Sequence, residues 1–345
     1  MNKSPKLICK NVWKLYGDKP KEFLQRNNYN PDKKTIEENG YVQAIRNATL
    51  EVYENEILVI MGLSGSGKST LVRCMSRLVD PTVGEIFFEN IDMGKLTKNE
   101  LIEIRRHKMG MVFQHFALFP HRTVIENIAF PLEVQGINRA ERERSALEII
   151  DLVGLQGREN YFPKELSGGQ QQRVGIGRSL AVKPELWFLD EPFSALDPLI
   201  RKEMQNEFLK IQNSLKKTII FITHDFDEAI KLADRIIIMN EGRIVQIGSP
   251  EDLIMKPADD YVKEFTEDLP RERLLSVKSI MSNIKESNNS LTVYEDEKIF
   301  SILEKVLSAG SVSVIDKSNN VVGSLNKDTV SRLSLIHISE PTRPY

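Results

Sequence analysis

Residues 62–70 combine glycines, a lysine and hydroxyl side chains at a spacing that suits phosphate binding. The segment fits the pattern G-x-x-x-x-G-K-[ST] between an apolar run expected to form a strand and a stretch expected to form a helix. Glycines let successive backbone N–H groups turn toward phosphate oxygens, and the helix N-terminus adds a positive end. Lys68 is expected to reach the β- and γ-phosphates of a nucleotide, and the Ser69 hydroxyl to bind Mg²⁺. The predicted phosphate-binding residues are Gly62, Ser64, Gly65, Ser66, Gly67, Lys68, Ser69 and Thr70.

Two adjacent acidic residues supply the metal-binding partner that a phosphate loop requires. Asp190 and Glu191 end or follow the apolar run that begins at Leu186, which is expected to form a buried strand. Asp190 is expected to hold Mg²⁺ through water, as the second acidic element of nucleotide hydrolases does. Glu191 is expected to take a proton from the attacking water. The alternative interpretation is a pair of solvated carboxylates at the end of a strand.

Gln114 and His224 are each expected to end a further strand close to the phosphates. The Gln114 amide is expected to contact Mg²⁺ or the attacking water, and to sense a partner on the adjacent loop. The His224 imidazole is expected to form a hydrogen bond with the γ-phosphate. Taken alone, a surface glutamine and a capped strand end are equally ordinary interpretations of these two residues.

A second glycine-containing segment lies about a hundred residues further along the chain, where "LSGGQQQRVG" spans Leu166 to Gly175. Ser167, Gly168 and Gly169 offer backbone donors and a hydroxyl, and a helix is expected to follow them with its N-terminus toward a phosphate. One phosphate loop leaves the far side of the γ-phosphate open to water. If two copies of the chain pack head to tail, each second loop can cap the nucleotide held by the other copy. We therefore expect an ATP-sandwiched homodimer.

In combination, these segments resemble the ATP-binding cassette (ABC) ATPase family over residues 7–265. The resemblance assigns Gly62–Thr70 to Walker A, Gln114 to the Q-loop, Leu166–Gln170 to the signature, Leu186–Glu191 to Walker B, Ser194–Asp197 to the D-loop and His224 to the switch histidine. It implies ATP and Mg²⁺ as cofactors, catalytic roles for Lys68, Gln114, Glu191 and His224, nucleotide contacts from Gln170 and Asp197, and metal contacts from Ser69, Gln114 and Asp190. It also implies an aromatic side chain stacked on adenine, for which Tyr16 is preferred and Tyr41 is the alternative.

Longer stretches are similar to the ATPase subunits of glycine betaine/proline importers, among them "VIMGLSGSGKST", "VFQHFALFPHRTV" and "ITHDFDEA". This resemblance implies a motor at the cytoplasmic face of the membrane, docked on two permease subunits through residues 116–119 and served by a solute-binding protein. Pro192 stands where many relatives carry Ala, and this departure removes no catalytic group. The alternatives are an importer of an amino acid or polyamine, a nucleotide sensor, and a soluble ABC ATPase of the DNA-repair type. The short, heptad-free segment between Gln114 and Leu166 argues against the last.

The elements that must position these residues alternate strand and helix, which predicts an α/β fold with a largely parallel sheet. The resemblance adds an antiparallel subdomain and a helical signature subdomain. The chain has 345 residues and a net charge of −2, which gives no general attraction to nucleic acid. No apolar run approaches the roughly 18 residues of a membrane span. Cys9 and Cys74 have no metal or redox spacing, as is typical of a cytosolic protein.

The composition changes after residue 265. We predict an ATPase domain over residues 1–265, a charged linker over 266–276 and a small βαββ unit over 277–332. The last of these resembles one CBS repeat, which implies a regulatory role, although such repeats normally occur in pairs. Residues 333–345 lose any helical period, and Pro341 and Pro344 exclude a helix there. This tail resembles the translation of a sequencing-library adapter, and we interpret it as non-native.

Overall fold

The structure is a computed structural model, and it describes residues 4–114, 116–267, 269, 271–282 and 291–335. The chain divides into two compact units, Met1–Ile247 and Gly248–Tyr345. The predicted boundary after residue 265 therefore falls inside the second unit. The reason is that α10 (Pro250–Met255) contacts both α11 (Asp260–Thr266) and α12 (Arg271–Leu274).

A six-stranded sheet forms the centre of the first unit, in the order β10-β9-β3-β8-β7-β6. Its strands are β3 (Ile57–Met61), β6 (Met109–Val112), β7 (Leu186–Asp190), β8 (Thr218–Ile222), β9 (Arg235–Asn240) and β10 (Arg243–Gly248). β3 runs parallel to β8 and β9, and β7 runs parallel to β6 and β8. Every residue of β3, β7 and β8 is buried, which explains their continuous apolar sequences. The predicted parallel sheet is confirmed, and its carboxyl edge brings the motif loops together.

A four-stranded antiparallel sheet, in the order β2-β1-β4-β5, lies beside the central one and shares a hydrophobic core with it. Its strands are β1 (Pro5–Tyr16), β2 (Val42–Tyr53), β4 (Val83–Phe88) and β5 (Ile91–Asp92). The polar insertion between β1 and β2 folds into α1 (Pro20–Arg26) and α2 (Lys33–Glu38). Phe23, Leu24 and Ile36 of these helices bury themselves against Trp13 and Leu15 of β1. The insertion is therefore a small packed appendage of the antiparallel sheet.

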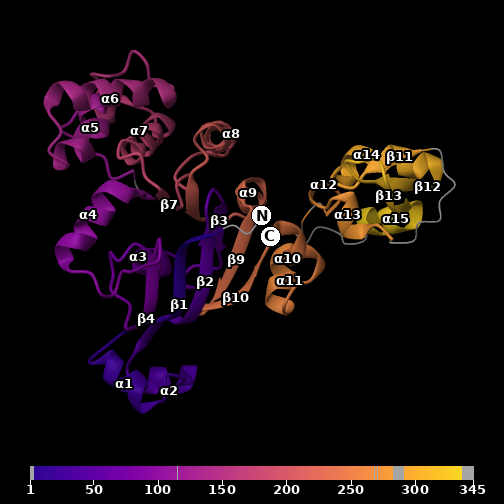
Figure 1. Cartoon of the computed structure of the whole chain (residues 1–345), viewed down its shortest axis with the longest axis horizontal. Helices are drawn as coiled ribbons and strands as arrows, with labels where there is room; N and C mark the ends of the chain where they lie inside the picture. The colour runs from indigo at the N-terminus through magenta and orange to yellow at the C-terminus, as the bar shows by residue number, and fades with distance from the viewer. Residues whose placement is uncertain (1–3, 115, 268, 270, 283–290, 336–345) are drawn as a thin grey trace. The chain divides into compact units, whose positions relative to one another are not determined.

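The remaining helices of the first unit are α3 (Lys68–Met75), α4 (Lys98–Lys108), α5 (Val124–Val134), α6 (Arg139–Leu152), α7 (Gly168–Leu180), α8 (Pro198–Leu215) and α9 (Phe226–Leu232). α5 packs against α6 and α7 in a helical group that stands apart from the sheets in Figure 1. Thr97 and Thr123 begin α4 and α5 with reciprocal capping boxes to Glu100 and Glu126. The helix α5 was not predicted from the sequence.

The second unit contains α10 to α12 and a three-stranded sheet in the order β11-β12-β13. Its other elements are α13 (Val277–Ile280), β11 (Thr292–Tyr294), α14 (Ile299–Ala309), β12 (Ser311–Ile315), β13 (Val321–Asn326) and α15 (Lys327–Leu335). These elements match the predicted βαββ order, whereas the predicted linker over residues 266–276 contains α12 and is partly helical. The resemblance to a CBS repeat stays a prediction. Helix α15 continues to Leu335, so residues 333–335 of the predicted tail are helical, contrary to the expectation, and residues 336–345 lie outside the described residues. Within the described part of the chain, no helix is both long and apolar enough to cross a membrane.

Candidate nucleotide site

The phosphate loop connects β3 to α3 in a backbone conformation that requires glycine. Gly62 and Gly67 have φ angles of 148° and 99°. A Cβ at Gly62 would lie 2.2 Å from the Met239 carbonyl oxygen, and one at Gly67 would lie 2.1 Å from that of Ala44. No side chain fits at either position without moving backbone. The loop is thus a rigid cradle bounded by β2 and β9, in which Ser64 and Gly65 are exposed and Thr70 lies in the first turn of α3.

Lys68 is buried at the first position of α3, with its ammonium group directed back over the loop. Nζ donates hydrogen bonds to the carbonyl oxygens of Gly62 at 2.8 Å and Leu63 at 3.0 Å. Burial lowers the pKa of Lys68, while the carboxylates of Glu191 and Asp190 act in the opposite direction. A cation placed in this way is suited to phosphate oxygens, because their charge compensates for the desolvation.

Ser69 and Asp190, two of the predicted metal ligands, are in direct contact. Ser69 Oγ donates a hydrogen bond of 3.1 Å to Asp190 Oδ1, although the two residues lie on different elements, α3 and the end of β7. Burial raises the pKa of Asp190, and the hydrogen bond from Ser69 partly offsets that effect. A hydroxyl and one carboxylate are a donor set that fits Mg²⁺, which usually takes few protein oxygens and completes its shell with phosphates and water. Consistent with this, no cluster of three or more His, Cys, Asp or Glu residues suited to a metal occurs among the described residues.

Glu191 lies next to Asp190 with a φ of 45°, in the left-handed region that a glutamate rarely adopts. Its Oε2 accepts a hydrogen bond from Gln114 Nε2 at 3.1 Å, and His224 Nδ1 lies 3.3 Å from the same oxygen. Two predicted catalytic residues, Gln114 and His224, therefore converge on the carboxylate of a third, Glu191. Gln114 and His224 were expected to end strands, but β6 ends at Val112 and β8 at Ile222. Both residues lie in the loops beyond, which lets their side chains turn over the sheet edge toward Glu191.

The second glycine segment begins α7 on the helical group. Ser167 is the N-cap of α7 and forms a capping box with Gln170, in which the Ser167 N–H donates to Gln170 Oε1 at 3.0 Å. Ser167 and Gly168 are exposed, whereas Gly169 is buried, and a Cβ there would lie 2.8 Å from Ile200 Cγ2. No hydrogen bond among the described residues joins this segment to the phosphate loop of the same chain.

The D-loop residue Asp197 has a structural role within the chain. It caps α8, because its Oδ1 accepts a hydrogen bond of 3.1 Å from the Ile200 N–H. Arg201 of α8 also donates to the backbone carbonyls of Ser194 and Leu196, which fixes the loop against the helix. The sequence analysis did not identify Arg201, because an arginine in a helix carries no signal of which loop it will hold.

The two candidates for the adenine-stacking aromatic differ in their surroundings. The Tyr41 ring stacks on Phe23 of the insertion with a centroid distance of 4.3 Å, and its hydroxyl donates to the Asp18 carbonyl at 2.5 Å. Tyr16 ends β1 with 45% of its surface exposed, and Lys14 Nζ lies 4.9 Å from its ring centroid. Tyr16 is the more exposed of the two, whereas the Tyr41 ring is stacked on Phe23, so Tyr16 stays the preferred prediction.

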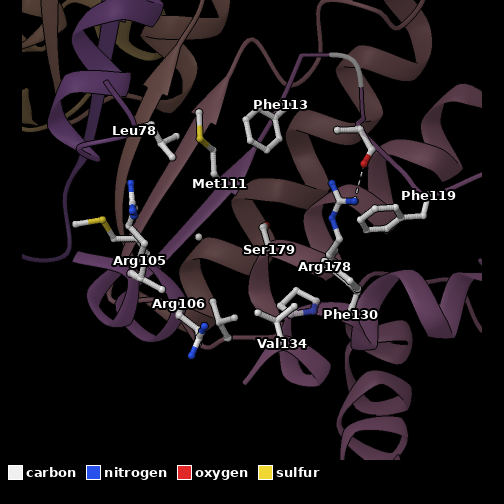
Figure 2. A pocket seen from close by; sticks show the side chains of 16 residues that line it. Leu78, Arg105, Arg106, Met111, Phe113, Phe119, Phe130, Val134, Arg178 and Ser179 are labelled. Atoms are coloured by element: carbon white, nitrogen blue, oxygen red, sulfur yellow. Dashed lines mark hydrogen bonds between the residues drawn. The ribbon is translucent and has the colours of Figure 1, made fainter. Parts of the chain in front are cut away.

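An apolar groove lies beside the loop that follows Gln114. It has a cavity volume of about 520 Å³ and lies between α4, α5, β6 and α7. Figure 2 shows apolar side chains around it, with the guanidinium groups of Arg105, Arg106 and Arg178 at its border. Of the predicted docking segment, Ala117 and Phe119 line this groove, and Phe119 packs on Phe130 with a centroid distance of 4.5 Å. The apolar and arginine residues that α4 and α5 contribute were not predicted.

Comparison with known proteins gives concordant results. Residues 45–194 match the family model for ABC transporters. The chain is 54% identical over 328 residues to the trimethylamine N-oxide transport system ATP-binding protein TmoW of Pelagibacter ubique (strain HTCC1062), covering 94% of this chain and 96% of that protein. It is 44% identical over 319 residues to the glycine betaine transport ATP-binding protein OpuAA of Bacillus subtilis (strain 168), covering 92% and 75%. A solved dimeric ATP-binding cassette in a post-hydrolysis state with ADP and Pi has a TM-score of 0.59 and 34% identity, covering 70% of this chain and 98% of that one.

These similarities confirm the predicted family, the ABC ATPase fold and the ATP-hydrolysing activity. They do not bear on the CBS-like unit. The chain therefore belongs to the ATP-binding subunits of ABC transporters, in the group of the glycine betaine and trimethylamine N-oxide importers, and it is an ATPase.

Proposed function

We propose that the chain is the motor of an importer for a small methylated amine, such as glycine betaine or trimethylamine N-oxide. The observation that carries this proposal is the apolar groove beside Gln114, because a motor must bind a permease next to its catalytic loops. The relatives described above support the class of cargo. An amino acid or polyamine remains the alternative cargo, since the residues that select a solute belong to other subunits.

In the proposed chemistry, the phosphate loop and Lys68 bind the phosphates of ATP, and Tyr16 stacks on adenine. Ser69 and Asp190 would hold Mg²⁺ with a contribution from Gln114, and the metal would neutralise charge that develops on the phosphates. Glu191 is the general base that takes a proton from the attacking water. His224 lies where it can hydrogen-bond both Glu191 and the γ-phosphate.

We propose further that the second glycine segment acts on a second copy of the chain. Ser167 and the N-terminus of α7 are exposed and unconnected by hydrogen bonds to the chain's own phosphate loop. A helix N-terminus with free N–H groups suits the γ-phosphate of another copy. The solved cassette to which the chain is similar is dimeric, which supports this arrangement.

The proposed permease contact uses the groove at the cytoplasmic face of the membrane. A helix of the permease would place apolar side chains against Phe113, Ala117 and Val134 and a polar end beside the border arginines. The contact would lie directly beside Gln114, so docking and hydrolysis would share one loop. Two motors would bind two permease subunits, and a solute-binding protein would deliver the cargo to them.

The second unit is proposed to regulate the motor in response to a signal that the sequence does not identify. Glu251 of α10 accepts hydrogen bonds of 3.1 Å from both the N–H and the Oγ of Ser276, and it also contacts Ser279 and Lys298. The CBS-like elements are thus joined to α10, which directly follows β10. Removal of residues 277–332 should leave basal ATP hydrolysis intact and change its response to salt.

The test is uptake in a bacterial strain that lacks osmolyte transport and produces this chain with its permease and solute-binding protein. Labelled glycine betaine or trimethylamine N-oxide should accumulate with the wild type. Val134→Asp should remove the permease from the purified complex and retain ATP hydrolysis, because Val134 borders the groove. Leu147→Asp is the matched control, since both side chains are 46% exposed and Leu147 lies on α6 outside the groove. Permease that stays bound to Val134→Asp contradicts the docking site, and ATP-driven uptake of neither amine contradicts the cargo class.

A further inference from the structure

Arg178 of α7 is a half-buried cation at the border of the groove. Its Nη1 donates a hydrogen bond of 2.6 Å to the Ala117 carbonyl, and its Nη2 donates one of 3.0 Å to the Phe116 carbonyl. The guanidinium carbon lies 5.8 Å from the Phe119 ring centroid. Burial lowers the pKa of Arg178, and no carboxylate acts in the opposite direction. Two carbonyls and one ring face therefore compensate for a charge that is costly to bury. Figure 2 shows the Arg178 guanidinium directed toward the loop that precedes Phe119.

The loop that Arg178 holds has an unusual backbone. Phe116 and Ala117 have φ angles of 47° and 50°, in the left-handed region that residues with a side chain seldom occupy. Conformations of this kind persist only where the surrounding structure imposes them, and they are common at switch regions. The carbonyls that accept the two Arg178 hydrogen bonds belong to these same two residues. The fork geometry of a guanidinium suits two neighbouring acceptors, whereas a lysine ammonium group has no such fork.

The left-handed backbone at Phe116 and Ala117, called the bend below, limits where Gln114 can lie. Gln114 is two residues before Phe116, and its Nε2 donates to Glu191 Oε2 at 3.1 Å. Gln114 itself is exposed, so no packing of its own side chain fixes it. The position of the amide therefore depends on the backbone on either side, which is β6 before it and the bend after it.

We propose that Arg178 is a positioning residue for ATP hydrolysis, which keeps Gln114 against Glu191 by holding the carbonyls of Phe116 and Ala117. It acts from the helix that begins with Ser167, so it links the capping segment of α7 to the loop beside the groove. The inference rests on the proposed role of Gln114 and is independent of the cargo.

The experiment measures steady-state ATP hydrolysis by the purified full chain. Arg178→Met should lower kcat by roughly 10- to 100-fold, the range typical of a displaced catalytic group, with KM for ATP changed less than about 2-fold. Arg77→Met is the matched control. Arg77 is half-buried like Arg178 and donates to a backbone carbonyl at 2.9 Å, but that carbonyl belongs to Met93 and Arg77 does not line the groove. The control should hydrolyse ATP at the wild-type rate.

A double-mutant cycle separates positioning from general loss of structure. If Arg178 acts through Gln114, Arg178→Met combined with Gln114→Ala should be no slower than the slower single variant by more than about 3-fold. Losses that multiply would show that Arg178 acts elsewhere and overturn the inference. If Arg178→Met does not fold, Arg178→Lys takes its place in the cycle, because it keeps the charge and loses the fork.

The outcomes also separate this inference from the proposed catalytic roles. Wild-type hydrolysis by Gln114→Ala would contradict the role of Gln114 and the inference together. Slow hydrolysis by Gln114→Ala with wild-type kcat for Arg178→Met would overturn the inference alone. A loss in Arg77→Met equal to that in Arg178→Met would show that removal of any half-buried arginine is sufficient, and would also overturn the inference.

Discussion

Asn127 should be among the most sensitive positions of the helical group, and the hydrogen bonds of its side chain give the size of the effect. Its Oδ1 accepts from the Phe119 N–H at 2.8 Å, and its Nδ2 has the carbonyls of Phe119, Arg122 and Thr123 within 2.9 to 3.1 Å. The side chain is fully buried. Since an amide has two N–H donors, about three good bonds are made. At about 1 kcal/mol net for each bond, Asn127→Leu should lower the free energy of unfolding by about 3 kcal/mol.

The assay is urea unfolding followed by tryptophan fluorescence, because both tryptophans of the chain, Trp13 and Trp187, lie buried in the first unit. The midpoint should fall with little change in the slope m, as expected for a loss of stability alone. Asn138→Leu is the matched control. Asn138 is an exposed cap of α6 that accepts one hydrogen bond from the Glu141 N–H, so its loss should cost about 1 kcal/mol. Equal losses in the two variants would refute the reasoning from buried partners.

Two further outcomes follow from the nucleotide site, and a third concerns the ion pairs of Glu89. Glu191→Gln should hydrolyse ATP at least ~100-fold more slowly and form an ATP-dependent dimer on size-exclusion chromatography, so a monomer with the wild-type rate contradicts a general base at this position. Lys68→Ala and Ser167→Arg should each be inactive alone but partly active when mixed in one dimer, and activity in either pure variant would contradict capping between chains. Burial opposes ionisation of Glu89, but hydrogen bonds from Lys108 and Lys6 lower its pKa from 4.5 to about 2. Its stabilisation is therefore present above about pH 4.5 and lost toward pH 2, so the unfolding midpoint of Glu89→Gln should lie below wild type at pH 7 and converge with it near pH 2.

The catalytic cluster could be predicted from the sequence because parallel strands end at one edge of a sheet. Once β3 and β7 were recognised as buried apolar runs, the loops that follow them had to meet, and Ser69 does contact Asp190. The same reasoning placed Gln114 and His224 at this edge but not at Glu191 Oε2, because each lies in irregular backbone two residues beyond the last residue of its strand.

Other features depended on contacts that no local pattern encodes. The preference for Tyr16 over Tyr41 stays a prediction, and the stacking of Tyr41 on Phe23 of the insertion, which bears on it, could not be known in advance. α5 was missed, although Thr123 and Glu126 form a capping box at its start, because Pro131 inside it argues against a helix. Asn127 binds the carbonyl of Thr123 and holds the segment that precedes this helix, a contact that only the folded chain reveals.

One oxygen of Glu191 links the predictions at the catalytic site. Gln114 and His224 both contact Oε2, and no hydrogen bond to Oε1 is found among the described residues, so in the proposed mechanism Oε1 would accept the proton from water. A change in either partner would alter the orientation of that carboxylate without removing it. Arg178 acts on this carboxylate indirectly, because it positions Gln114 through its hydrogen bonds to the loop carbonyls. Residues that act on one group as a unit give non-additive losses, so rate effects at these positions should overlap instead of multiplying. Multiplicative effects throughout would mean that each residue acts on a different step, and the convergence on Oε2 would then have no catalytic meaning.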